Sequence, residues 1–255
     1  MTTRLAPARY LELIDADATR LLAVTKDLDA SVPTCPDWTV RDLVEHLATV
    51  YQHKIACTTL QRQPEEPAEW PPPTPPGDPR DWLAASRAEL LELLLDRGPA
   101  APSATWWPPD QTVGFWYRRM AQETAVHRVD GESAVGEITP VAEDLAIDGI
   151  DEVLMIMLEG DWSDMSAEDW GEVSPDAGAG QTVAVLGGDA VWRVQLRPDR
   201  VGVEIGAGPA DATVGGDPSD VLLWLWGRRP VDAVQVSGDH GAVTALRDRL
   251  VLATG

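Results

Sequence analysis

Cysteine and positive charge are both scarce in this chain of 255 residues. The two cysteines, Cys35 and Cys57, are too few for a disulfide framework and form no CxxC metal-binding pattern, which favours a reducing cytoplasm. Acidic residues outnumber basic ones by 42 to 20, and the formal net charge is −22. Because such a charge repels phosphate backbones and anionic lipid surfaces, we expect neither nucleic acid nor a membrane surface as a partner.

Long apolar runs are also absent. No stretch reaches the roughly 18 apolar residues of a transmembrane helix, and the N-terminal sequence MTTRLAPARYLELIDAD carries acids where a signal peptide needs an apolar segment. Lysine occurs twice against eighteen arginines, a bias typical of a high-GC genome. The sequence predicts a soluble intracellular protein, long enough for two modest domains. It does not indicate an oligomeric state.

The first half of the chain contains amphipathic segments separated by proline-rich links. Their apolar residues recur at the helical steps of three and four. The predicted helices cover residues 7–29, 39–60, 78–97 and 113–129. Thr39 with Asp42 three residues later is a variant of the capping box, Asp130-Gly131 is expected to end the fourth helix, and eight prolines in residues 64–79 predict an extended connection. Four helices with long links predict an all-α four-helix bundle.

The composition changes after Gly136, where strand-like runs with glycine turns replace the long helical patterns. In order, we expect a helix over 141–159, a loop over 160–180, three short antiparallel strands within 181–206, a helix over 220–228, a strand near residue 234 and a helix over 240–252. The sequence therefore predicts a helical domain at residues 1–138 and an α+β domain at residues 139–255.

Three residues of the predicted bundle form a candidate metal site. Glu123 and His127 are four positions apart, so both side chains can chelate one ion from one face of the fourth helix. His46 lies beside the apolar stripe of the second helix and should point into the bundle interior, where facing helices assemble metal sites. Two histidines and one glutamate suit a divalent ion, with zinc favoured, and leave one coordination position open. The spacing alone also fits a solvated acid–base pair and an ordinary core histidine.

Two segments resemble the mycothiol-dependent maleylpyruvate isomerase branch of the DinB-like superfamily. VPTCPDWTVRDLVEHLA is similar to the family's second-helix signature, in which His46 occupies the position of a metal-binding histidine. RMAQETAVHRVDGE resembles the fourth-helix motif, and places Glu123 and His127 at the other two ligand positions. The C-terminal part, with its short strands and DVLLWLWGRRP, is similar to the family's sterol-carrier-like α+β domain.

This resemblance implies an enzyme that uses a divalent metal and a low-molecular-weight thiol, usually mycothiol in actinobacteria. The metal-bound thiolate would attack a small electrophile, either to isomerise a double bond, as with maleylpyruvate, or to remain as the adduct of an S-transferase. A non-enzymatic metal- or ligand-binding protein and a purely structural metal clip are the alternatives. The family's arginine near the site implies a catalytic, carboxylate-binding role for Arg228, although an arginine there also complements a helix dipole.

Several other residues allow both a functional and a structural interpretation. His53 and Cys57 have the spacing of a second metal pair, but lining or core roles are favoured. Cys35 precedes a helix and has the position of a reactive thiol, although the resemblance assigns the reactive sulfur to the cosubstrate. Weaker candidates are Arg229, Arg80, Arg118 and Arg119. Four tryptophans are candidates to line a pocket, although core packing is favoured for most of them: Trp38, Trp106, Trp107 and Trp116.

Overall fold

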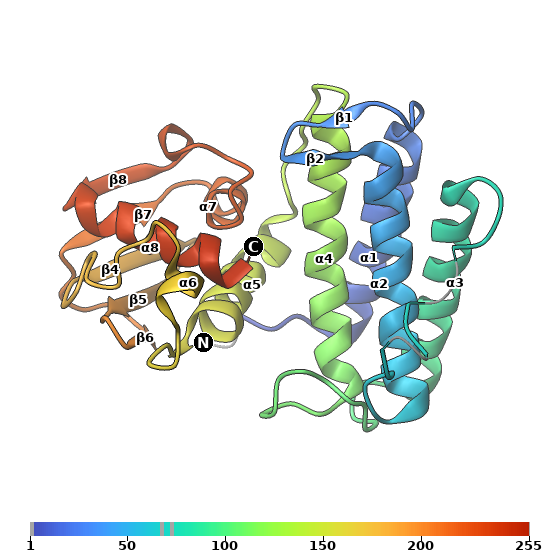
Figure 1. Ribbon diagram of the computed structural model, residues 1–255, viewed down its shortest axis with the longest axis horizontal. Coiled ribbons are helices and arrows are strands. Elements are labelled where there is room, and N and C mark those ends of the chain that lie inside the picture. The colour runs from blue at the N-terminus through green and yellow to red at the C-terminus, as the bar shows by residue number, and fades with distance from the viewer. Residues whose placement is uncertain (1–2, 67–68, 72–73, 255) are drawn as a thin grey trace. The chain divides into compact units, whose positions relative to one another are not determined.

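The computed structural model describes residues 3–66, 69–71 and 74–254, which form two compact units (Figure 1). The N-terminal unit spans Arg4–Thr139, and the chain enters the C-terminal unit at Pro140. The boundary predicted from the sequence follows residue 138. Within the proline-rich segment 64–79, residues 67–68 and 72–73 lie outside the described residues.

Four long helices lie side by side in the N-terminal unit (Figure 1). They are α1 (Pro7–Val24), α2 (Val40–Leu60), α3 (Pro79–Arg97) and α4 (Val113–Ser133), with a hairpin of β1 (Ser31–Val32) and β2 (Cys35–Thr39) before α2. The predicted all-α bundle is confirmed. Pro7 occupies the first turn of α1, where its missing N–H costs no helical hydrogen bond.

The helix starts follow their capping residues. Thr39 and Asp42 form the predicted capping box of α2, in which the Asp42 carboxylate accepts from the Thr39 backbone N–H at 2.8 Å. Asp78 caps α3 by accepting from the backbone N–H of Arg80. The predicted end of α1 near residue 29 was wrong, because Thr25 already leaves the helical conformation and its hydroxyl turns back to the carbonyl of Leu21 at 2.9 Å.

Helix α4 is longer and more buried than the sequence suggests. The prediction that Asp130-Gly131 ends it was wrong, because the helix continues to Ser133. Gly131 lies where α4 crosses α1, and a Cβ added there would come within 2.3 Å of the Leu21 Cδ1 atom. The glycine therefore allows close helix packing instead of a turn. Buried ion pairs satisfy several charged side chains of α4, such as Arg128 with Glu132 at 2.7 Å.

We expect Gly131→Val to destabilise the N-terminal unit. The added methyl groups would overlap the fully buried Leu21, and overpacking of this kind costs about 1–3 kcal/mol. Glu92→Val on the exposed side of α3 introduces the same β-branched side chain without a close contact and serves as the control. Urea unfolding followed by circular dichroism measures both variants; a Gly131→Val protein as stable as the control would contradict this packing.

The C-terminal unit combines a six-stranded sheet with helices, as predicted for an α+β domain. The strand order is β3-β6-β5-β4-β7-β8. Its strands are β3 (Gly160–Asp161), β4 (Thr182–Gly187), β5 (Ala190–Leu196), β6 (Arg200–Ile205), β7 (Ala212–Gly215) and β8 (Gln235–Gly238). The three strands predicted within residues 181–206 are confirmed as β4, β5 and β6, in which β5 pairs antiparallel with both β4 and β6. Strand β7, which the sequence did not predict, pairs in parallel with β4, so the complete sheet is mixed.

Helices pack on this sheet and complete the apolar core of the unit. They are α5 (Glu143–Glu152) with the π-helix η1 (Val153–Leu158), α6 (Ala167–Trp170), α7 (Pro218–Leu225), the 3₁₀ turn η2 (Val231–Ala233) and α8 (His240–Thr254). Helices α5, α7 and α8 contact β4, whose side chains are largely buried. The predicted loop at residues 160–180 contains the short strand β3 and helix α6. Among the described residues, no helix combines the length and apolarity needed to cross a membrane.

Candidate metal centre

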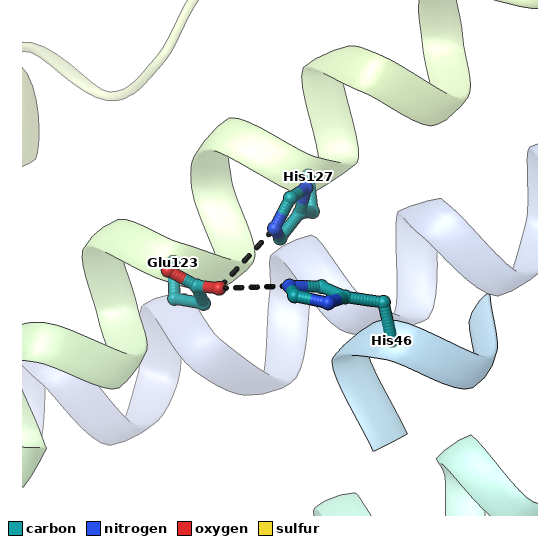
Figure 2. Close-up of side chains that lie close together, drawn as sticks. All are labelled: His46, Glu123 and His127. Carbon is teal, nitrogen blue, oxygen red and sulfur yellow. Dashed lines mark hydrogen bonds and ion pairs between the residues drawn. The ribbon is translucent and has the colours of Figure 1, made fainter. Parts of the chain in front are cut away.

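Helices α2 and α4 bring the three predicted metal ligands together. Figure 2 shows Glu123 and His127 extending from α4 towards His46 on α2. The capping box at Thr39 fixes the start of α2, and His46 follows two helical turns later, beside the buried Leu43 and Leu47. His127 is buried, whereas His46 and Glu123 remain partly exposed, so the centre has an open side.

The donor atoms of this cluster have the separations that one ion requires. Glu123 Oε1 lies 3.2 Å from His127 Nε2 and 3.4 Å from His46 Nε2. Ligands about 2.1 Å from a tetrahedral zinc lie about 3.4 Å apart. All three donor atoms fall within 4.8 Å of one another. Two imidazole nitrogens and one carboxylate oxygen therefore fit a divalent ion and leave a position for a further ligand.

Asp130 supports the centre from behind His127. Its Oδ2 atom lies 2.9 Å from His127 Nδ1, and its Oδ1 atom accepts from the Thr34 hydroxyl at 2.6 Å. This contact fixes the ring so that Nε2 faces Glu123, the usual arrangement behind a metal-binding histidine. Burial alone would lower the pKa of His127, but the hydrogen bonds with Asp130 and Glu123 outweigh burial and raise this pKa to about 9.

Replacing Asp130 with asparagine should weaken metal binding while all three ligands remain. The neutral amide cannot hold or polarise the His127 ring as the carboxylate does, and such losses cost about 10–100-fold in affinity. Competition against a chromophoric chelator gives the dissociation constant. Thr34→Val, which removes one hydrogen bond to Asp130 but keeps its charge, is the matched control and should have a smaller effect. Unchanged affinity in Asp130→Asn would exclude this supporting role.

Glu123 is held ionised by its cationic neighbours. Burial acts to raise the pKa of Glu123, but hydrogen bonds from His127 and His46 and the charge of Arg119 hold it well below its ordinary value. Arg119 Nη2 donates to Glu123 Oε2 at 2.8 Å, so the other oxygen, Oε1, is left facing the two histidines. The sequence ranked Arg119 among the weaker candidates, yet it orients the carboxylate.

An open pocket of about 530 Å³ borders the exposed side of His46. The hairpin contributes Asp37 and Trp38, and the proline-rich link contributes Pro71 and Thr74. The Trp38 ring centroid lies 4.8 Å from that of His46 and 6.0 Å from that of His127. Trp38 therefore lies against the metal centre, as the sequence allowed, and limits access of water to both histidines.

Arg228 belongs to the C-terminal unit, whereas the three candidate metal ligands belong to the N-terminal unit. It follows α7 and the positive-φ residue Gly227, and its backbone N–H donates to the Leu223 carbonyl at 2.7 Å. Its Nη1 atom donates to the carbonyl of Trp226 at 2.8 Å. The neighbouring Arg229 lies 3.4 Å from the Asp220 carboxylate. The catalytic role of Arg228 stays a prediction.

The two cysteines and His53, which the sequence offered as further candidates, lie outside the metal cluster. Cys57 is buried and donates to Gln63 Oε1 at 3.2 Å, while burial raises the pKa of its thiol. Its Sγ atom lies 3.6 Å from His53 Nδ1, but the described residues bring no further histidine, cysteine or carboxylate into a metal cluster with this pair. Burial, followed by the charge of Lys54, lowers the pKa of His53 to about 4. Cys35 lies on β2 and is not part of the metal cluster.

The other arginine and tryptophan candidates stabilise the fold around the bundle. Arg80 pairs with Asp78 at 2.5 Å, and Arg118 is buried on α4. Trp116 is fully buried and donates to Ser103 Oγ at 2.9 Å. The rings of Trp106 and Trp107 pack against Phe115, with centroids 5.3 and 6.1 Å away.

Two family models match the two units. The mycothiol maleylpyruvate isomerase N-terminal domain matches residues 11–131, and the C-terminal domain of the same family matches residues 144–245. The chain belongs to this family. Membership was predicted from the two helix motifs and is confirmed over both units. A comparison with curated protein sequences gives no significant match.

One solved structure of a mycothiol-dependent maleylpyruvate isomerase shares the fold at low sequence identity. A histidine-to-alanine mutant of the mycothiol-dependent maleylpyruvate isomerase matches with a TM-score of 0.55 and 14% identity, over 92% of this chain and 95% of that chain. A further structure of the mycothiol-dependent maleylpyruvate isomerase gives a TM-score of 0.49 and 13% identity with the same coverage. A UbiJ-SCP2 ubiquinone synthesis protein covers 42% of this chain with a TM-score of 0.28, so the sterol-carrier likeness stays a prediction.

Sequence reasoning missed Asp130. The Asp130-Gly131 pair has the form of a helix stop, and this interpretation hid the position of Asp130 one turn after His127. The i,i+3 spacing of a carboxylate behind a histidine was the available signal.

Proposed function

We propose that this protein is a metal-dependent enzyme that uses mycothiol or a similar low-molecular-weight thiol. Its reaction is either isomerisation of the maleylpyruvate type or a related S-transfer to a small electrophile. The observation that carries the proposal is the convergence of His46, Glu123 and His127 beside an open pocket, in a chain that belongs to the mycothiol maleylpyruvate isomerase family.

The donor set of the centre fits a divalent ion, with zinc favoured. When bound, such an ion would lower the pKa of a coordinated thiol and so supply a thiolate near neutral pH. His46 and His127 each offer an Nε2 atom, and Glu123 offers Oε1, leaving one direction for the thiol. Asp130 holds the His127 ring in place, and Arg119 holds the Glu123 carboxylate.

The chain supplies binding and water exclusion around this centre. Trp38 places an apolar ring next to both histidine rings, and the pocket beside His46 has room for a small substrate. A dry, preorganised site strengthens the interactions of a thiolate with its surroundings. Arg228 is proposed, by its family position, to bind a carboxylate of the substrate or of the thiol.

Turnover by the metal-loaded protein tests this function. Zinc-loaded wild type is incubated with mycothiol and either maleylpyruvate or a panel of unsaturated and halogenated electrophiles. Absorbance reports cis–trans isomerisation, and mass spectrometry reports stable thiol adducts. Glu123→Gln, which keeps the size of the side chain but loses the anionic ligand, should lose at least about a hundredfold in kcat/KM. Equal rates in wild type and Glu123→Gln for every electrophile would contradict the proposal.

A further inference from the structure

The pocket beside His46 is bordered by negative charge. Asp37 comes from β2, whereas Asp42 and Glu45 lie on α2 one turn or less before His46. The other described residues that border this pocket are His46, Trp38, two threonines and a proline, so none of them is a lysine or arginine. The pocket therefore presents three carboxylates to whatever group enters it.

One arginine, Arg41, partly compensates two of these three carboxylates. Asp42 accepts from the Thr39 hydroxyl and backbone N–H at 2.5 and 2.8 Å, and these contacts, together with the charge of Arg41, hold its pKa below the ordinary value. Glu45 forms an ion pair with Arg41 at 3.8 Å, and because both side chains are partly exposed, solvent weakens this pair. Asp37 is exposed. Arg119 is engaged with Glu123 behind the centre.

A substrate carboxylate would meet like charges in this pocket. Repulsion between like charges weakens binding, and the repulsion grows as solvent is excluded from between the charges. A neutral group avoids this loss of affinity, and a cationic group gains affinity from the carboxylates. The net charge of −22 acts in the same direction at long range. Trp38, Thr49 and Thr74 offer an aromatic face and hydroxyls, which suit an uncharged polar or cationic group.

We propose that the pocket formed by Asp37, Trp38, Asp42, Glu45 and Thr49 beside His46 selects a substrate whose entering group is uncharged or cationic, and discriminates against carboxylates. This inference rests on the proposed metal–thiol function and narrows its substrate class. The discrimination comes from residues adjacent to a metal ligand and acts only on the group that enters this pocket, so a carboxylate elsewhere on the substrate remains available to Arg228.

Thiol binding to the cobalt-substituted protein tests the inference without turnover. Three phenylmethanethiols carry a carboxylate, a hydroxymethyl or an aminomethyl group at the para position, where the ring prevents a second contact with the same metal. The thiolate-to-cobalt charge-transfer band gives each dissociation constant, corrected for the thiol pKa. We expect the anionic thiol to bind at least about tenfold more weakly than the neutral one, and the cationic thiol to bind at least as tightly as the neutral one.

The double variant Asp37→Asn/Glu45→Gln should reduce the preference against the anionic thiol by at least about threefold. Asp42 stays unchanged because it caps α2. Glu92→Gln on α3, an exposed carboxylate that does not border the pocket, controls for net charge and should leave the preference as in wild type.

Three results would overturn the inference. If wild type binds the anionic thiol as tightly as the neutral thiol, or more tightly, the proposed charge selection is excluded. It is also excluded if the double variant keeps the full wild-type preference against the anionic thiol. Both of these outcomes leave the metal–thiol function standing. The absence of a charge-transfer band with all three thiols would refute the proposed metal–thiol function itself, and the substrate inference with it.

Discussion

His46→Ala is expected to reduce bound metal from about one divalent ion per chain to nearly none. The substitution removes one of three donors, so the remaining Glu123 and His127 hold the ion only as a two-residue chelate on α4. The fold should persist because His46 is partly exposed, its imidazole lies at the open side of the centre, and alanine favours helix α2. Metal content falls while helical structure remains.

His53→Ala is the matched control for this experiment. His53 lies on the same helix two turns further along, is partly buried, and accepts a hydrogen bond from Lys54 at 3.0 Å instead of facing the carboxylate of Glu123. Elemental mass spectrometry gives the metal content of wild type and both variants after zinc loading, and circular dichroism gives their helical content. Full metal retention in His46→Ala, or equal loss in His53→Ala, would remove His46 from the centre.

The local features of the bundle were readable from the sequence because short-range chemistry sets them. Thr39 and Asp42 satisfy the free N–H groups at the start of α2, so the helix boundary follows from two residues three positions apart. The i,i+4 pair Glu123 and His127 needed only the helical period to share a face. His46 needed the additional inference that its side of α2 faces inward, which the apolar stripe supplied.

Features that depend on contacts distant in sequence were not readable. Asp-Gly is an ordinary turn signal. Here Gly131 instead packs against Leu21 where α4 crosses α1, and the helix continues past it. Within the continued helix, the Asp130 carboxylate reaches the His127 ring. The parallel pairing of β4 with β7 likewise joins strands that β5 and β6 separate in the sequence, and it has no local signal. The acidic border of the pocket arises only when the hairpin places Asp37 beside the first turns of α2.

Metal affinity should rise steeply with pH because, in the metal-free protein, a proton occupies the His127 nitrogen that would bind the ion. In the metal-free protein the pKa of His127 is about 9, since the hydrogen bonds with Asp130 and Glu123 outweigh the opposing effect of burial. Near neutral pH the ring is therefore cationic, and an ion must displace its proton to reach Nε2. The apparent affinity should increase by about tenfold per pH unit up to a pH of about 9 and then level off.

The stability of the metal-free protein changes in the opposite direction. A histidine whose pKa is raised on folding stabilises the fold fully below its unfolded value of about 6.5. That contribution declines above this value and is lost as pH passes the folded pKa of about 9. The metal-bound protein carries a neutral His127 and lacks this decline, so the difference in unfolding temperature between loaded and metal-free protein should widen over this interval.

Calorimetric titration with zinc measures the proton exchange directly. Near pH 7.5 in two buffers of different ionisation enthalpy, wild type should release close to one proton per ion from His127. Asp130→Asn removes one of the two anions that raise the pKa of His127, so this variant should release fewer protons than wild type and its affinity should level off at a lower pH. Equal proton release by both proteins would mean that the displaced proton comes from a group other than His127. The pH dependence of metal binding would then not depend on the contact between Asp130 and His127.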